Sequence, residues 1–173
     1  MGLESTVLDL TKRVPAVLRP GGVTLEALRG LLGEVRVDAA ALAPLESAAV
    51  PRSPGMKYKH YAPDADLVIV AGPEEARAAL ACRLYDEAAA AGERAVVLAP
   101  AEREKRCAPR TFRALGAEND PHSAAARLFA ALRELDAQGF ERIIAEAVEA
   151  EGIGLAVMNR LYRAAGFCVR YAE

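Results

Sequence analysis

The stretch "DLVIVAGPEEARAALACRLYDEAAAAGERAVVLAP", residues 66–100, decides the fold class of this 173-residue chain. Its first seven residues form an apolar run rich in β-branched side chains, which is typical of a buried strand. Residues 73–92 place apolar side chains at four-residue spacing, at Ala76, Leu80, Leu84 and Ala88. This spacing, with acids in the first turn, predicts an amphipathic helix that ends at Gly92. Residues 95–100 predict a second buried strand.

The same alternation continues to the end of the chain. Further strands are predicted at residues 111–116, 142–148 and 167–171, and a last helix at 154–165 with Val157, Met158, Leu161 and Tyr162 facing inward. Asp120 and Pro121 are suited to begin another helix, as N-cap and first-turn proline, and Gly139 to end it. The apolar stripe of that helix is Ala125, Leu128, Phe129, Leu132 and Leu135.

Strands that are apolar on both faces and alternate with helices favour a mostly parallel, three-layer, Rossmann-like α/β sheet. No GxGxxG follows the first of these strands, and GxxxxGK[ST] occurs nowhere. A dinucleotide site or a P-loop in this part of the chain therefore has no support in the sequence.

The first 38 residues follow a different pattern. Short strands are predicted around residues 5–11, 16–20 and 34–38, and Thr24 caps a helix that Gly33 closes. The apolar stripe of this helix is Leu25, Leu28, Leu31 and Leu32. So short a segment buries too little surface to fold alone. We expect residues 1–38 to be the C-terminal remnant of another α/β domain, 39–63 to be a linker, and 64–173 to be the α/β domain described above.

Composition excludes several classes of protein. Apolar residues make up 53% of the chain, yet no run of eighteen exists to span a membrane. The three cysteines, Cys82, Cys107 and Cys168, form no CxxC pair, so neither a zinc site nor a disulfide framework is expected. We interpret them as small core residues of a cytoplasmic protein. His122, beside the predicted N-cap at Asp120, is interpreted as a surface residue.

Charge is unevenly distributed along a chain whose formal net charge is −2. Residues 1–61 carry eight basic and six acidic side chains, whereas the remainder carries fourteen and eighteen. The acidic balance of the second part argues against direct nucleic-acid binding. Between residues 51 and 61 there is no acid, which favours an anionic partner there.

The stretch "SPGMKYKHYAP", residues 53–63, interleaves aromatic and basic side chains after a Pro-Gly turn. In an extended chain, Tyr58 and His60 would face one way, and Lys57, Lys59 and Tyr61 the other. A plain linker would be rich in Gly, Ser or Pro. The segment is therefore interpreted as packing onto another surface, either as a basic strap between domains or as a lid over a ligand.

Four stretches, in this order, resemble the long-form, two-domain threonylcarbamoyl-AMP synthases of the YrdC-related group: "GLESTVLDLT" (2–11), "VLRPGGVTLEALRGLLG" (17–33), "SPGMKYKHYAP" and "EGIGLAVMNRLYRAA" (151–165). The resemblance covers nearly the whole chain. It implies a preceding catalytic domain with a basic Lys/Arg motif and a second polar motif, neither of which this sequence contains. The chain is thus expected to be a C-terminal part, inactive alone.

The resemblance implies synthesis of threonylcarbamoyl-AMP and pyrophosphate from ATP (with Mg²⁺), L-threonine and bicarbonate, for threonylcarbamoyladenosine modification of tRNA. It implies that Ser5 contacts threonine and that Arg19, Ser53 and Tyr58 contact ATP. Lys57, Tyr58, Lys59, His60 and Tyr61 would form the lid. From the residues alone, the preferred interpretation of Ser5 is a hydroxyl on an edge strand, and that of Arg19 is a surface residue in a turn.

Two alternatives stay open for the α/β domain. It could be a non-catalytic module that binds a small ligand or a protein and regulates the intact enzyme, with the carboxyl edge of the sheet as the expected site. It could also be a structural unit that forms a homodimer. Asn159 and Arg160 could meet a partner, although a solvated helix face is the interpretation preferred here.

Overall fold

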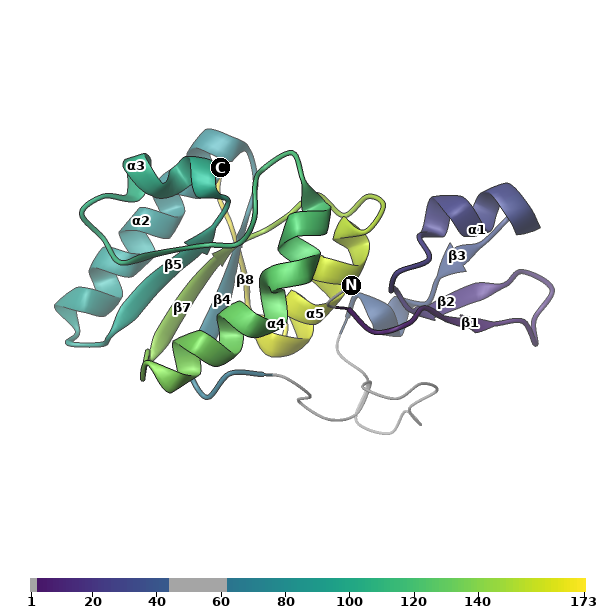
Figure 1. Cartoon of the computed structure of the whole chain (residues 1–173), viewed down its shortest axis with the longest axis horizontal. Coiled ribbons are helices and arrows are strands. Elements are labelled where there is room, and N and C mark those ends of the chain that lie inside the picture. The colour runs from purple at the N-terminus through teal and green to yellow at the C-terminus, as the bar shows by residue number, and fades with distance from the viewer. Residues whose placement is uncertain (1–2, 44–61) are drawn as a thin grey trace.

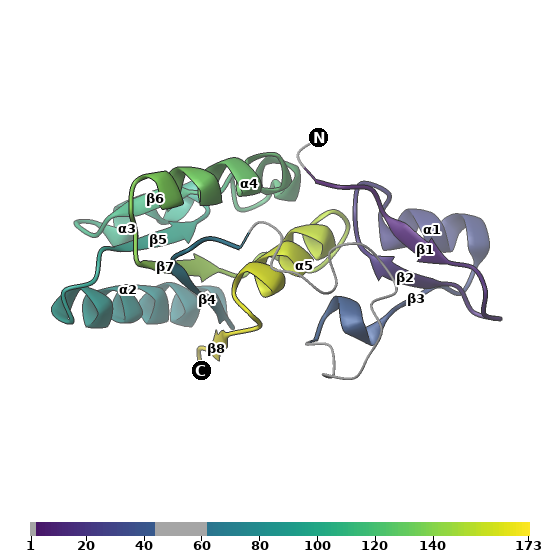
Figure 2. The same cartoon turned by 90° about the horizontal axis from the view of Figure 1, so that it is seen from below.

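The computed structural model describes residues 3–43 and 62–173. Figures 1 and 2 show two sheets on opposite sides of the helix α5 (Gly154–Ala164). The larger sheet and its helices come from the second described segment, and the smaller sheet with α1 comes from the first. Helix α5 therefore lies between two units that are far apart in sequence.

The larger sheet has five strands, all parallel, in the order β6-β5-β7-β4-β8. The strands are β4 (Asp66–Ala71), β5 (Ala95–Ala99), β6 (Phe112–Ala114), β7 (Arg142–Glu146) and β8 (Val169–Tyr171). All five occur where the sequence predicts strands. Because the strands are parallel, their carboxyl ends meet at one edge of the sheet.

Helices cover both faces of this sheet, which confirms the three-layer α/β prediction. Helices α2 (Glu74–Ala90) and α3 (Glu104–Cys107) share one core with it, and α4 (Pro121–Ala137) and α5 share the other. A single turn, η2 (Ala101–Arg103), precedes α3. Strand β4 shows the two-sided burial: Leu67 and Ile69 face α4 and α5, and Val68 and Val70 face α2.

The start of α4 also follows the prediction. The Asp120 carboxylate accepts hydrogen bonds from the amides of His122 and Ser123, at 3.1 and 3.2 Å. Pro121 occupies the first turn, where its missing N–H costs nothing. His122 is exposed, as expected for a residue beside a cap.

The smaller sheet has the order β1-β2-β3, with β1 (Val7–Asp9) antiparallel to β2 (Ala16–Arg19) and β3 (Arg36–Val37) parallel to it. Helix α1 (Leu25–Leu32) begins at Thr24, whose hydroxyl accepts from the Ala27 amide, and a turn η1 (Ala39–Ala41) follows β3. No residue of α1 is buried, and Leu31 is 82% exposed. The predicted helix thus forms, with Leu25 and Leu28 of its apolar stripe half-buried and Leu31 and Leu32 exposed.

Among the described residues, no helix is both long and apolar enough to cross a bilayer.

Candidate functional site

The structure brings Ser5 and Arg19 together where β1 pairs with the end of β2. The Arg19 guanidinium donates from Nε to the Ser5 carbonyl oxygen at 3.1 Å and from Nη2 to Ser5 Oγ at 3.3 Å. We call residues 4–6 and 19–23 the N-terminal junction. Two of the residues predicted to contact ligands therefore lie side by side, although fourteen positions separate them in sequence.

Close backbone contact holds the two sides of the N-terminal junction. A Cβ on Gly21 would lie 2.4 Å from the Glu4 carbonyl oxygen and 2.4 Å from the Thr6 nitrogen, which only a glycine avoids. Next to it, the Thr6 hydroxyl donates to the Val23 carbonyl at 2.7 Å and accepts from the Val23 amide at 3.0 Å. The turn after Arg19 is thus fixed against the strand that carries Ser5.

Arg160, on helix α5, contacts both sides of the N-terminal junction and is only 7% exposed. Its Nε donates to Glu4 Oε2 at 2.8 Å, and its Nη1 donates to the Pro20 carbonyl at 2.7 Å. Burial raises the pKa of the Glu4 carboxyl, but the attraction and hydrogen bond of Arg160 lower it further, so the pKa lies below its usual value. Burial also outweighs this pairing at Arg160 and lowers its pKa; an arginine nevertheless stays charged.

Two further contacts from α5 hold the end of the smaller unit. Asn159 Nδ2 donates to the Ala41 carbonyl at 2.5 Å, and Arg163 Nη2 donates to the Ala40 carbonyl at 2.6 Å. The interpretation of Asn159 and Arg160 as a solvated helix face is therefore wrong. The missed signal is the run Leu155–Met158 of four consecutive apolar residues, because a helix that is apolar all round is covered on several sides.

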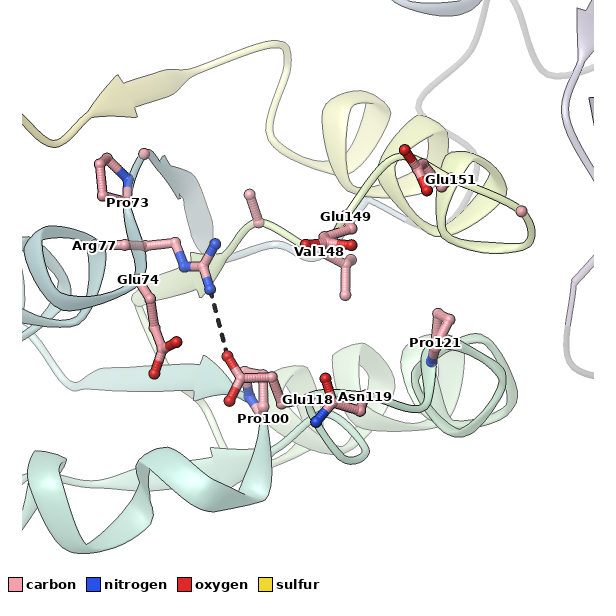
Figure 3. Close-up of a pocket in the computed structure, with 13 residues that line it drawn as sticks. Pro73, Glu74, Arg77, Pro100, Glu118, Asn119, Pro121, Val148, Glu149 and Glu151 are labelled. Atoms are coloured by element: carbon pink, nitrogen blue, oxygen red, sulfur yellow. Dashed lines mark ion pairs between the residues drawn. The ribbon is translucent and has the colours of Figure 1, made fainter.

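A second concave site lies at the carboxyl edge of the five-stranded sheet, as the sheet topology leads one to expect. It is a cavity of about 770 Å³. Figure 3 shows its walls, which come from the segments that follow β4, β5, β6 and β7. The residues that line it include Pro73, Arg77, Pro100, Glu118, Asn119, Glu149 and Glu151.

Arg77 extends toward the middle of this cavity (Figure 3). Its Nε donates to Glu146 Oε2 at 3.0 Å, and its Nη2 lies 3.9 Å from Glu118. Arg103 joins the same group, with Nε 3.5 Å from Glu146 Oε2 and a close ion pair with Glu118. Burial raises the pKa of Glu146, although both arginines act in the opposite direction.

The walls of the cavity are acidic, since four of the charged residues that line it are glutamates: Glu74, Glu118, Glu149 and Glu151. A polyphosphate would meet repulsion from this surface. No group of three or more metal-binding side chains occurs among residues 3–43 and 62–173. The arrangement suits a ligand without multiple negative charges.

The remaining predicted site residues, Ser53, Lys57, Tyr58, Lys59, His60 and Tyr61, lie outside the described residues. The cysteine prediction holds only in part. Cys107 is buried, and its Sγ lies 3.9 Å from that of Cys82, but Cys168 is exposed near the sheet's edge strand β8. It is therefore not a core residue.

Fold and site together define the class of protein. A parallel three-layer α/β unit is in contact, through one buried helix, with a second, three-stranded sheet that carries a serine–arginine pair. The family model described as "Threonylcarbamoyl-AMP synthase, C-terminal domain" matches residues 23–166. The chain belongs to this family, which confirms the resemblance seen in the sequence.

Relatives and solved structures agree with that assignment. Over 167 residues the chain is 39% identical to the threonylcarbamoyl-AMP synthase of Pyrococcus abyssi, covering 96% of this chain and 47% of that protein. The Bacillus subtilis threonylcarbamoyl-AMP synthase is also 39% identical, with 96% and 46% covered. The crystal structure of P. abyssi Sua5 complexed with L-threonine matches with a TM-score of 0.87 and 36% identity, covering 99% of this chain and 48% of that one. The chain thus spans about half the length of these relatives.

Proposed function

We propose that this chain supplies the C-terminal part of an enzyme that makes threonylcarbamoyl-AMP. The substrates are ATP with its Mg²⁺, L-threonine and bicarbonate, pyrophosphate is released, and the product serves threonylcarbamoyladenosine modification of tRNA in the cytoplasm. The observation that carries the proposal is the N-terminal junction, in which Ser5 and Arg19 meet. The family assignment and the threonine bound to the P. abyssi structure support the same activity.

Ser5 and Arg19 have separate roles in this proposal. The Ser5 hydroxyl hydrogen-bonds L-threonine, and the Arg19 guanidinium contacts the nucleotide phosphates, for which its planar fork is well suited. In the reaction, the threonine amine and bicarbonate form an N-carboxylate with loss of water. An oxygen of this carbamate then attacks the α-phosphorus of ATP and displaces pyrophosphate. Positioning of the reactants and cationic stabilisation of the leaving group supply most of such catalysis.

The proposal requires a catalytic partner domain, and the smaller unit offers a surface for one. Leu31 is 82% exposed and Leu32 is 47% exposed on α1, while Leu10 and Val23 are also largely open. Apolar side chains gathered on one small unit favour burial against another protein surface. In the same scheme Ser53 and Tyr58 contact ATP, and residues 57–61 form a lid that excludes water from the reactive product.

The test joins this chain to the catalytic domain of a relative and measures pyrophosphate release. Ser5→Ala is expected to raise the KM for L-threonine about tenfold or more, and Arg19→Gln to raise the KM for ATP similarly, since each removes a positioned hydrogen-bonding group. Arg13→Ala is the matched control, because Arg13 is an exposed arginine on the same sheet's hairpin. Unchanged kinetics in both Ser5→Ala and Arg19→Gln would refute the assignment of this site.

A second candidate function is regulation by a small ligand, and the cavity at the carboxyl edge favours it. Its wall touches the smaller unit, because the Gly152 amide donates to Glu26 Oε1 of α1 at 3.4 Å. A metabolite screen by thermal shift would test this candidate, with Arg77→Ala expected to abolish any stabilisation. If no metabolite raises the Tm of the chain, regulation by a small ligand at this cavity is rejected.

A further inference from the structure

One buried guanidinium connects the α/β domain to the two segments that carry Ser5 and Arg19. Arg160 binds Glu4, the residue directly before Ser5, at 2.8 Å from Nε and 2.7 Å from Nη2. It also binds the carbonyl of Pro20, the residue directly after Arg19, at 2.7 Å. The residues next to Ser5 and Arg19 in sequence are therefore both hydrogen-bonded to the side chain of Arg160.

The contacts close a ring. Arg19 reaches back to Ser5 through two hydrogen bonds, and Arg160 spans the far side from Glu4 to Pro20. The separation of Ser5 and Arg19 is consequently set from both directions. The other contacts that set it lie on the side of the smaller sheet: the pairing of β1 with β2, the Thr6–Val23 hydrogen bonds and the close approach at Gly21.

We propose that Arg160 is the positioning residue of the substrate site: it holds Ser5 and Arg19 at the separation that L-threonine and the nucleotide phosphates require. The inference rests on the proposed function of those two residues. It gives the accessory domain a defined part in the reaction, because α5 belongs to that domain and not to the sheet that carries the site. Arg160 itself does not touch substrate in this scheme.

Arginine is the residue type that this role demands. From one planar group, Nε donates to the Glu4 carboxylate and Nη1 donates to the Pro20 carbonyl, so the two directions are fixed together, while Nη2 completes the ion pair with Glu4. A lysine carries the same charge on a single nitrogen and cannot reproduce these directions. Arg160→Lys therefore separates positioning from charge.

The neighbouring Arg163 is the matched control. It is on the same helix and binds the Ala40 carbonyl at 2.6 Å, in the segment after β3 and away from Ser5 and Arg19. Its guanidinium also lies over the Phe167 ring, 5.2 Å from the centroid. Arg163→Lys weakens a contact between the two units without changing a neighbour of either ligand-contact residue.

The first test observes the N-terminal junction in this chain by NMR. In Arg160→Lys and in Glu4→Gln, the Nε–H resonance of Arg19 and the amides of Ser5 and Thr6 are expected to shift and to exchange faster with solvent. Arg163→Lys should leave these signals in place. The inference is overturned if the Arg19 and Ser5 signals are unaltered in both junction variants while the Tm falls as much as in Arg163→Lys. Arg160 would then stabilise the chain without positioning Ser5 and Arg19.

The second test uses the two-domain enzyme and separates this inference from the proposed function. Arg160→Lys and Glu4→Gln are each expected to raise the KM for L-threonine about tenfold, because a misplaced contact group weakens binding, whereas Arg163→Lys leaves it unchanged. If Ser5→Ala raises the KM for L-threonine and neither Arg160→Lys nor Glu4→Gln does, the positioning role of Arg160 is refuted and the proposed role of Ser5 is retained. If Ser5→Ala also has no effect, the proposed function of the site fails with it.

Discussion

Replacing Gly21 by alanine tests the geometry of the N-terminal junction through stability. The new Cβ would lie 2.4 Å from the Glu4 carbonyl oxygen and the Thr6 nitrogen, and 2.5 Å from the Ser5 carbonyl carbon. Non-bonded carbon atoms prefer about 3.5 to 4.0 Å, so the turn and the strand must separate by about 1 Å. These neighbours are backbone atoms and cannot rotate away. Overpacking of this kind costs about 1–3 kcal/mol.

Separation of the two segments also weakens the bonds that cross between them. The Thr6 hydroxyl pairs with the Val23 backbone, and Arg19 donates to Ser5. A net loss of about 1 kcal/mol for the better of these bonds brings the expected destabilisation of the smaller unit to about 2–4 kcal/mol.

Gly30→Ala is the matched control. Gly30 is exposed in α1, and a Cβ there would meet nothing within 4 Å. Alanine is favoured over glycine inside a helix by about 0.5–1 kcal/mol, so this variant should stabilise the same unit. Urea unfolding followed by hydrogen exchange at the Val23 amide reports the unit that carries both residues. If Gly21→Ala and Gly30→Ala both raise the free energy of unfolding, or both lower it, the close backbone approach at Gly21 is refuted.

Three further predictions concern the described residues. Native-state labelling with a thiol reagent should modify the exposed Cys168 first and leave the buried Cys107 unreacted until unfolding. Burial and the adjacent Cys82 raise the pKa of Cys107 to about 12, so fast labelling of Cys107 would contradict its placement. The Glu4 pKa lies below its usual 4.5, since burial raises it but Arg160, a backbone hydrogen bond and Arg19 together lower it more. The stabilisation that Glu4 provides is therefore present above about pH 4.5 and is lost as the pH falls through the folded pKa, so the difference in unfolding free energy between the native chain and Glu4→Gln should shrink in acid. Leu31→Glu should change the stability of this chain by less than about 0.5 kcal/mol, because Leu31 is 82% exposed, but it should lower the activity of the two-domain enzyme. Full activity would show that Leu31 of α1 does not contact the catalytic domain.

Local patterns were sufficient to predict most of the α/β domain. The two-sided apolar run of β4 and the cap at Asp120 depend on residues near one another in sequence, so the sequence carries them directly. The spacing of apolar residues also predicts α1, but the exposure of Leu31 and Leu32 depends on what covers the helix, which periodicity does not encode. The division of the chain at residues 38 and 63 stays a prediction.

The candidate site is likewise predictable from the sequence only in part. Ser5 and Arg19 meet because β1 and β2 form an antiparallel pair. Both residues lie in sequence motifs that predict ligand contact. The sequence does not predict the role of Arg160, because its partners are separated from it by most of the chain and a charged residue on a helix is usually solvated. The pairing of Arg77 with Glu146 depends on β7 lying beside β4, an order that no local pattern fixes.

We propose that this chain completes a threonylcarbamoyl-AMP synthase. The most direct measurement is threonine-dependent pyrophosphate release from ATP and bicarbonate by the catalytic domain of a relative, with and without this chain attached. We predict release at a substantial rate only in the joined protein, and none from this chain by itself. An equal rate from the catalytic domain alone, or no release from the joined protein, would contradict the account.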